Sequence, residues 1–328
     1  MKIAYTGSHF PETVKHGIQN YMADKGYPVG MVAPKTRDAW DSRDELKSYE
    51  IIICAGEQYG GDIIEYLSGA EPKLKMLSRH GIGTDEIKKD IATKSGIAVC
   101  NAAGSLSACV AECALALILN VLHGYGALDR DMREGIWDSG FTSELQKKTV
   151  GLIGFGGIAQ HLAKYLGVFE CEIIAHDPYF NEDAAKKLGV KKASLEQICE
   201  RSDIISLHVP LTDETRGMID KAFLSAMKQS AILINTSRGA VANESELYEA
   251  LSAGVIAGAG LDVFEKEPAD KNNPLLTLRN VMLLPHVASH SCESQLEAGL
   301  MACRNVIAFI EGRQPESLLN PEYKKYIN

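Results

Sequence analysis

The stretch TVGLIGFGGIAQHLAKYLG at residues 149–167 constrains the fold more than any other part of the chain. An apolar run that predicts a strand leads into the glycine-rich segment 154–159, and an amphipathic helix follows. This order matches the G-x-G-x-x-G/A turn of a βαβ unit, with Ala159 at the last position. Gly154 would allow the tight turn, and Gly156 would let the backbone approach a pyrophosphate at the helix N-terminus. The stretch therefore predicts an α/β fold that binds a dinucleotide.

Short apolar runs alternate with amphipathic helical segments along the chain, which predicts βαβ units and parallel sheets. A first set of strand candidates comprises Ile3–Thr6, Val29–Ala33, Ile51–Ala55, Leu74–Ser78 and Ala98–Cys100. A second, more apolar set comprises Thr149–Gly154, Glu172–His176, Ile204–His208, Ala231–Asn235, Gly258–Asp262 and Val281–Leu284. Strands that are apolar along their whole length are typical of sheets covered on both faces.

Two long helical segments, at about 106–122 and 292–311, lie before and after the second set of strands. We therefore expect two doubly wound α/β domains, with the second inserted into the first. Residues 1–105 and 291–328 would form the outer, substrate domain, and residues 106–290 would form the inserted domain. A ligand is expected in a cleft between the two domains.

Composition argues against several classes of partner. The 328 residues are 45% hydrophobic and 23% charged, as in soluble globular proteins. The net charge is −9 and the lysines and arginines are scattered, which argues against nucleic acid or an anionic membrane as partner. The most apolar run, Leu106–Leu122, carries Glu112 in its middle, so it predicts a buried helix or one crossing between domains rather than a membrane span.

Eight cysteines are spread along the chain, and they form no C-x-x-C pair. A chain of this size can be stable without disulfides, so reduced thiols and a cytoplasmic location are expected. The first residues, MKIAYTG, lack the apolar core of a signal peptide and predict a first strand.

Asp177 follows the strand candidate after the glycine-rich turn. A carboxylate at this spacing can accept a hydrogen bond from the adenine ribose of a dinucleotide. The same carboxylate would repel a 2′-phosphate, so NAD is expected in preference to NADP. The alternative is an ordinary strand-end turn residue before Pro178.

Three later strand ends carry polar residues: Arg238, Glu267 and His286. In a doubly wound sheet, groups beyond the carboxyl ends of the strands line the ligand crevice. A guanidinium can hold a carboxylate through two hydrogen bonds. An imidazole beside a carboxylate becomes a proton donor at neutral pH. Each residue alone also has a structural interpretation, as a turn cap, a loop charge or a strand-end histidine.

From about Arg79 to Glu293 the chain resembles the D-2-hydroxyacid dehydrogenase family, which includes D-lactate, D-glycerate and D-3-phosphoglycerate dehydrogenases. The matching stretches, in the family's order, are SRHGIGTDEI, VAECALALIL, GLIGFGGIA, HDPY, LHVPLTDETRGMI, LINTSRGAVANE, AGLDVFEKEP and LLPHVAS. The resemblance implies a Rossmann NAD-binding domain inserted into a flavodoxin-like substrate domain. It also implies hydride transfer between NADH and the carbonyl of a 2-oxo acid, which gives a D-2-hydroxy acid, and the reverse. A homodimer is the expected assembly.

The same resemblance implies a role for each site residue. Arg238 would anchor the substrate carboxylate and carbonyl, Glu267 would orient and charge His286, and His286 would protonate the carbonyl oxygen. The NAD cofactor would be bound by Gly154, Phe155, Gly156, Gly157, Ile158, Asp177, Val209, Pro210, Thr215, Thr236, Ser237, Arg238, Asp262, His286 and Ser289. The substrate would be bound by Arg79, Arg238 and the backbone of Gly81, Ile82 and Gly83.

The chain departs from the family pattern at several positions. Gly157 stands where the family often has a basic residue, and GIGTDEI replaces the commoner valine–aspartate–asparagine pattern. Arg79 could reach a substrate phosphate, as in the phosphoglycerate enzymes. His290 has no assigned role. A zinc site at His286 and His290 is not expected, because no glutamate follows His286 and the preceding proline predicts a helix start rather than a helix interior.

Two other functions fit parts of the pattern. Some relatives of the family are NAD-sensing corepressors that keep the same three polar residues, but this chain has no basic or disordered tail for recruiting a partner. Formate dehydrogenase, another relative, has glutamine where Glu267 stands. The sequence therefore predicts the enzyme and leaves the identity of its 2-oxo acid open.

Overall fold

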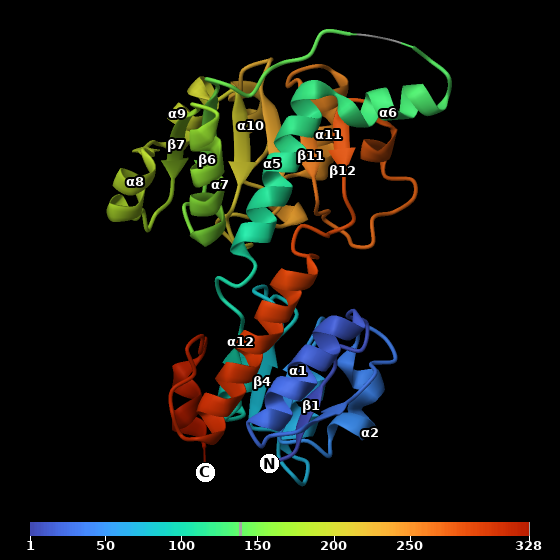
Figure 1. The fold of residues 1–328 in the computed structure, drawn as a ribbon, viewed down its shortest axis with the longest axis vertical. Coiled ribbons are helices and arrows are strands. Elements are labelled where there is room, and N and C mark those ends of the chain that lie inside the picture. The colour runs from blue at the N-terminus through green and yellow to red at the C-terminus, as the bar shows by residue number, and fades with distance from the viewer. Residues whose placement is uncertain (138–139, 328) are drawn as a thin grey trace. The chain divides into compact units, whose positions relative to one another are not determined.

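The computed structural model describes residues 1–137 and 140–327. The chain forms two compact units, which we call unit 1, Met1–Leu106 with His290–Asn328, and unit 2, Ser107–Ser289. Unit 2 is thus an insertion in the sequence of unit 1 (Figure 1). The sequence predicts limits that lie one residue away from each of these junctions.

Unit 1 contains a five-stranded parallel sheet with the strand order β2-β1-β3-β4-β5. This is the 2-1-3-4-5 order of flavodoxin-like folds. The strands are β1 Ile3–Tyr5, β2 Val29–Met31, β3 Ile51–Cys54, β4 Met76–Arg79 and β5 Ala98–Cys100. The five predicted strands are therefore all present, and β4 lies one to two residues later than predicted.

Helices cover both faces of the unit 1 sheet, because successive strand residues point to opposite faces and both sets are apolar. Ile51 packs in one buried cluster with Ile18 of α1 and Val306 of α12. Ile52 packs in a second cluster with Ile63 of α3. The helices are α1 Glu12–Asp24, α2 Arg43–Leu46, α3 Gly61–Ser68, α4 Lys89–Lys94 and α12 Cys292–Ile310, with short 3-10 turns η1 Ala39–Ser42 and η4 Pro321–Tyr326.

Unit 2 contains a seven-stranded parallel sheet with the order β12-β11-β10-β9-β6-β7-β8. From β6 the chain first builds outward through β7 and β8, then crosses back to β9 and continues to β12. This is the Rossmann order with one extra strand, and it reverses between β6 and β9. The strands are β6 Thr149–Ile153, β7 Glu172–His176, β8 Lys191–Lys192, β9 Ile204–Leu207, β10 Ile232–Asn235, β11 Gly258–Leu261 and β12 Val281–Leu283.

Both faces of the unit 2 sheet are covered as well. Leu152 packs in one buried cluster with Ala114 of α5 and Leu162 of α7, and Figure 1 shows α5 lying across the sheet. Leu233 packs in the other cluster with Leu247 of α11. The helices are α5 Ser107–His123, α6 Tyr125–Arg133, α7 Gly157–Val168, α8 Glu182–Leu188, α9 Leu195–Arg201, α10 Lys221–Ala226 and α11 Glu244–Ser252, with 3-10 turns η2 Gly239–Val241 and η3 Pro274–Thr277.

The apolar run that ends at Leu122 forms α5, and its inward face is part of the unit 2 core. Glu112 lies on the exposed side of this helix. Among the described residues, no single helix has the length and apolar composition to cross a membrane; α5 and α6 reach them only together, and a 64° bend separates the two. The prediction of a buried helix is confirmed.

Candidate functional site

The glycine-rich turn lies between β6 and α7, next to the point where the strand order of unit 2 reverses. Gly154 has a φ of 92°, and a Cβ at this position would lie 2.4 Å from the carbonyl oxygen of His208. Only glycine combines this backbone conformation with so close an approach. The first residue of α7 is Gly157, and the helix begins without a side-chain cap. The first N–H groups of α7 are therefore open to an anion.

Asp177 follows β7 and is bound to the same turn. Its Oδ2 accepts a hydrogen bond from the Phe155 amide at 2.6 Å, and its Oδ1 accepts one from the Tyr179 amide at 2.7 Å. The two bonds fix the carboxylate beside the glycine-rich turn. The predicted ribose ligand and the predicted pyrophosphate loop are thus brought together at one edge of the sheet.

The segments after β9 and β10 add polar groups at this edge. Thr215 Oγ1 donates to the carbonyl oxygen of Pro210 at 2.6 Å, which folds the segment that follows Val209 into a compact turn. Ser237 donates to Asn235 Oδ1 through both its amide and its hydroxyl, at 3.0 and 2.9 Å. Thr236 Oγ1 is buried and has no hydrogen-bond partner among the described residues. An unpartnered buried hydroxyl at a strand end is consistent with a ligand group that is not part of the protein.

Three features of unit 2 agree with a bound dinucleotide. A Cβ at Gly156 would meet no atom within 4 Å, so there is open space beside the turn. The N-terminus of α7 offers free amides to a pyrophosphate. The Thr236 hydroxyl lacks a protein partner among the described residues. The residues predicted to hold the cofactor therefore have the chemistry that such a group requires.

Arg238 is held at the end of β10 by its neighbours. Its carbonyl oxygen accepts from Asn235 Nδ2 at 2.9 Å, and its Nη1 donates to the Ser237 carbonyl at 2.7 Å. The next residue is Gly239, where a Cβ would lie 1.8 Å from the carbonyl carbon of Phe264. Glycine at 239 thus lets the Arg238 segment lie against the segment that leads to Glu267. Neither Asn235 nor Gly239 was predicted as a site residue, although both stand in the INTSRG stretch.

Glu267 and His286 form a close pair in unit 2. His286 Nδ1 lies 2.6 Å from Glu267 Oε2, and Glu267 Oε1 accepts from the Phe264 amide at 3.1 Å. Burial alone would raise the pKa of the Glu267 carboxyl, but the hydrogen bonds from His286 and Phe264, with the charge of Arg238, hold this pKa below its usual value. The carboxylate is therefore ionised at neutral pH beside the ring. The His286 side chain is 47% exposed.

Asp262 builds the turn that carries His286. Its carbonyl oxygen accepts from the His286 amide at 2.8 Å, and its two carboxylate oxygens accept from the amides of Val287 and Ala288 at 2.8 and 2.9 Å. Burial raises the pKa of the Asp262 carboxyl, and the two amide bonds oppose that shift without cancelling it. Asp262 was predicted as a cofactor ligand; in the structure it also sets the backbone around His286. No feature of the local sequence indicates this second role.

The predicted substrate residues Arg79, Gly81, Ile82 and Gly83 belong to unit 1, where they end and follow β4. Arg79 donates to the carbonyl oxygens of Gly83 and His80, at 3.2 and 3.1 Å. His290 also belongs to unit 1, whereas His286 belongs to unit 2. The described residues contain no group of three or more His, Cys, Asp or Glu side chains that could hold a metal ion.

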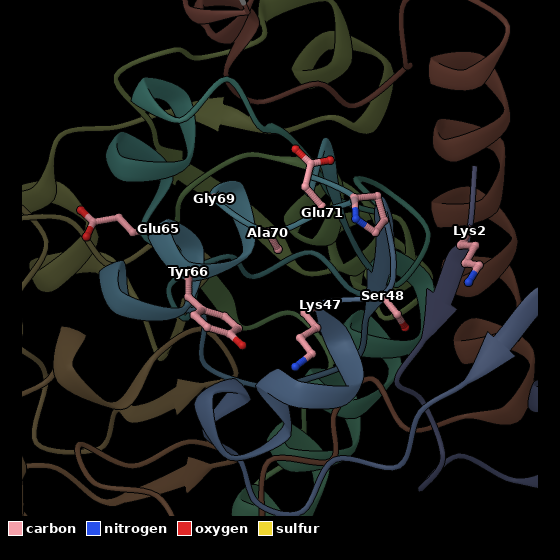
Figure 2. Close-up of a pocket in the computed structure, with 9 residues that line it drawn as sticks. Lys2, Lys47, Ser48, Glu65, Tyr66, Gly69, Ala70 and Glu71 are labelled. Carbon is pink, nitrogen blue, oxygen red and sulfur yellow. The ribbon is translucent and has the colours of Figure 1, made fainter.

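Unit 1 also has an open hollow of about 600 Å³ (Figure 2). Its lining includes Lys2, Ser48 and Pro72, which precede β1, β3 and β4, so it lies at the amino ends of these strands. Figure 2 shows its charged side chains spread around the rim rather than converging. Ligands of doubly wound sheets bind at the carboxyl ends. The hollow is therefore not the candidate site.

Comparison with known proteins identifies the family. A family model described as "D-isomer specific 2-hydroxyacid dehydrogenase, NAD binding domain" matches residues 115–288, which lie within unit 2. A glyoxylate reductase of Korarchaeum cryptofilum is 42% identical over 262 residues, 78% of this chain and 79% of the relative. A D-3-phosphoglycerate dehydrogenase of Archaeoglobus fulgidus is 34% identical over 94% of this chain, which spans only 58% of that protein.

A solved structure with the same fold is an NADPH-dependent glyoxylate/hydroxypyruvate reductase of Sinorhizobium meliloti in complex with NADP and malonate. It is 28% identical, has a TM-score of 0.83, and the match covers 98% of this chain and 97% of that one. The predicted architecture of two parallel α/β sheets is thus confirmed by the structure and by its neighbour. The cofactor of unit 2 is a nicotinamide dinucleotide. The chain belongs to the family of D-isomer-specific 2-hydroxyacid dehydrogenases.

Proposed function

We propose that the protein reduces the carbonyl of a small 2-oxo acid to a D-2-hydroxy acid with NADH, and catalyses the reverse reaction. The observation that carries this proposal is the 2.6 Å contact between His286 and Glu267. Both residues follow the carboxyl ends of strands in the sheet that carries the glycine-rich turn. An acid–base pair at that place is what proton transfer to a substrate carbonyl requires.

His286 acts as the acid in reduction and as the base in oxidation. Glu267 occupies Nδ1, so Nε2 is the nitrogen that gives its proton to the carbonyl oxygen. Glu267, ionised at neutral pH, stabilises the protonated ring and fixes its orientation. Arg238 holds the substrate carboxylate and carbonyl through its guanidinium, which suits two-pronged recognition of a carboxylate. The bound dinucleotide supplies the hydride.

The cofactor is held by unit 2 through the turn 154–158, Asp177 and the ends of β9 to β11. We infer that NAD is preferred over NADP, because the Asp177 carboxylate, fixed beside the turn, would repel a 2′-phosphate. The Sinorhizobium meliloti relative is NADPH-dependent. The preference for NAD is therefore inferred from Asp177 of this chain, and it is tested by comparing NADH with NADPH. Residues Thr236 and Asp262 lie at the same edge of the sheet and complete the cofactor site.

The names of two similar reductases give glyoxylate and hydroxypyruvate as their substrates. The alternative, a phosphorylated substrate as in the Archaeoglobus fulgidus relative, would need a free cation in unit 1. Arg79 is already bonded to backbone carbonyls there. We therefore propose a small unphosphorylated 2-oxo acid as the substrate.

The protein is proposed to be a cytoplasmic homodimer. All eight cysteines carry free thiols, which suits a reducing compartment. Several large apolar side chains are exposed on and just after α6, including Tyr125 at 53%, Met132 at 55% and Trp137 at 85%. Large apolar side chains exposed along one segment are what a surface covered by a second subunit would present. Analytical ultracentrifugation would give a monomer mass if this proposal is wrong.

The proposed activity is tested by the loss of NADH absorbance on adding glyoxylate, hydroxypyruvate, pyruvate and phosphohydroxypyruvate, with NADPH in parallel. We expect turnover with at least one unphosphorylated acid and a preference for NADH of at least about tenfold in kcat/KM, which is about 1.4 kcal/mol. NADH binding without turnover of any 2-oxo acid would favour a cofactor-sensing protein over an enzyme. Equal use of NADPH would overturn the role of Asp177.

A further inference from the structure

Four consecutive carbonyl groups of unit 1 are bonded to the scaffold around them. They belong to residues 80–83, which we call the β4 loop. The bonds are Arg79 Nη1 to His80 O at 3.1 Å, Ala102 N to Gly81 O at 2.8 Å, Asn101 Nδ2 to Ile82 O at 2.8 Å, and Arg79 Nε to Gly83 O at 3.2 Å. The orientation of every peptide plane in the loop is thus fixed.

These bonds determine where the amides of the β4 loop point. In a trans peptide the N–H is directed opposite to the C=O of the same plane. With the four carbonyls turned toward the scaffold, the N–H groups of residues 81–84 are turned away from it. They make no hydrogen bond to any acceptor within residues 1–137 and 140–327. Successive free N–H groups form a concavity that binds an anion.

We propose that Asn101 is a positioning residue for the substrate carboxylate: by holding the Ile82 carbonyl, it keeps the amides of the β4 loop aimed at that anion. The inference rests on the proposed function, which supplies the carboxylate. Asn101 follows β5 and is 7% exposed. Its own backbone is anchored, because its carbonyl accepts from Asn305 Nδ2 at 2.9 Å and its amide donates to the Ser317 carbonyl at 3.3 Å. The side chain is therefore presented to the loop from a fixed base.

The other end of the Asn101 amide supports this role. Its Oδ1 is buried and lacks a hydrogen-bond partner among the described residues. An unpartnered buried acceptor costs about 1–3 kcal/mol. An apolar side chain of the same size would avoid that cost, but it would leave the Ile82 carbonyl without its donor. The amide is therefore kept at this position for the bond to Ile82 O.

Arg79 acts in the same way on the first and last carbonyls of the β4 loop, those of His80 and Gly83. Its Nη1 donates to the carbonyls of Cys54 and His80, at 3.4 and 3.1 Å, while its Nε reaches Gly83. Gly81 lies against the guanidinium, where a Cβ would be 3.5 Å from Arg79 Cζ. A planar fork can bond to several carbonyls at once, which a lysine ammonium on a flexible stem does not reproduce. Arg79 therefore shapes the carboxylate site rather than serving as a ligand for a substrate phosphate.

The test compares Asn101→Leu, which keeps the volume and removes the donor, with Arg79→Lys, which keeps the charge and removes the fork. The measurements are KM and kcat for glyoxylate, the inhibition constant of oxalate and the Kd of NADH. We expect both variants to raise KM and the oxalate inhibition constant at least tenfold. The expected change in kcat is less than threefold, and in the Kd of NADH less than twofold, because NADH binds to unit 2.

Asn320→Ala is the matched control. Asn320 is a buried asparagine of unit 1 that accepts from the Val99 amide and donates to the Ile97 carbonyl, so its loss costs stability without touching the β4 loop. It should lower Tm and leave KM and oxalate inhibition unchanged. Equal loss of oxalate binding in this control, or an unchanged KM in Asn101→Leu, would overturn the inference.

Two further outcomes are distinguishable. A wild-type protein that reduces no 2-oxo acid would reject the proposed function before any variant is compared. If Asn101→Leu does not fold, the Arg79→Lys variant decides. Wild-type KM and wild-type oxalate inhibition in Arg79→Lys would mean that the charge of residue 79 matters at this site and the positioning of the loop does not. That result would overturn the inference.

Discussion

His286 has a φ of 57°, a conformation that residues other than glycine adopt rarely. The three hydrogen bonds to Asp262 at 2.8, 2.8 and 2.9 Å hold the backbone in this conformation. Such a conformation costs on the order of 1–3 kcal/mol and persists only where the surroundings enforce it. In unit 2 the strained backbone aims the ring at Glu267. The proposed acid–base pair is therefore positioned by the backbone as well as by its own contact.

Replacing Glu267 by glutamine should change the pH dependence of reduction. Without the carboxylate, the positive charge that the His286 ring carries as the proton donor loses its partner at 2.6 Å. Because reduction needs that donor, the alkaline limb of kcat/KM should move to lower pH. The profile is measured with NADH and the best 2-oxo acid between pH 5 and 10. Glu265→Gln, an exposed loop glutamate bonded to the Glu244 amide, is the control and should not move the limb.

His80 should make unit 1 sensitive to acid. The ring is 2% exposed; its Nε2 donates to the Gln295 carbonyl and its Nδ1 accepts from the Tyr5 hydroxyl, which requires the neutral form. Burial lowers the pKa of His80 to about 3. The unfolded chain titrates near 6.5, so this stabilisation is complete above about pH 6.5 and is lost as the pH falls toward 3.

Between pH 7 and pH 5 the wild type should therefore lose about 2 kcal/mol more of its unfolding free energy than His80→Gln. Urea unfolding of both proteins at several pH values gives the difference. His16→Gln, at an exposed histidine on α1, is the control. Parallel pH profiles for wild type and His80→Gln would show that the ring does not titrate in this way.

At the scale of elements, two glycines of the turn between β6 and α7 should have different roles. Gly154 is needed for the fold of the turn, and Gly156 is needed for binding of the cofactor. Gly154→Ala introduces a Cβ 2.4 Å from the His208 carbonyl at a φ of 92°, so we expect it to lower Tm by several degrees. At Gly156 the φ is −77° and a Cβ meets nothing within 4 Å. Gly156→Ala should keep the wild-type Tm and raise the Kd of NADH at least tenfold, because the methyl group occupies the space for the pyrophosphate. Thermal unfolding and NADH fluorescence titration test both variants.

Gly217→Ala is a control that measures the cost of the backbone conformation without a steric clash. Gly217 has a φ of 63°, and a Cβ at this position would meet no atom within 4 Å, so only the conformational cost applies there. A smaller loss of Tm in Gly217→Ala than in Gly154→Ala is expected. If Gly156→Ala binds NADH as well as the wild type, the turn does not hold the pyrophosphate.

The strands of both sheets could be predicted because each core strand buries two faces and is apolar throughout. β8 was not predicted. It consists of Lys191 and Lys192, both exposed, at the edge of the unit 2 sheet. Its pairing with β7 is made by backbone atoms, which leave no apolar signal in the sequence. Edge strands of this length follow from the position of their neighbours rather than from their own residues.

At the scale of the whole molecule, the insertion of unit 2 between residues 106 and 290 could be predicted from two runs of strands separated by long helices. For the candidate site, the sequence predicts residues whose type carries the chemistry itself, such as Arg238, Glu267 and His286, and the structure shows Glu267 and His286 in contact. Asn101 was missed because its role lies in one hydrogen bond to Ile82, nineteen residues earlier in the chain. An asparagine after a strand has no pattern that distinguishes this bond from an ordinary turn.

The central claim is that His286, and not His290, supplies the proton. The most direct measurement is steady-state NADH oxidation by His286→Ala and His290→Ala, with NADH fluorescence titration of both variants. General acid catalysis contributes about a hundredfold to ten-thousandfold. His286→Ala should lose that much 2-oxo acid reduction while binding NADH with a Kd within about threefold of the wild type. His290→Ala should stay within about tenfold in kcat/KM. Wild-type turnover in His286→Ala, or a loss of turnover confined to His290→Ala, would contradict the account.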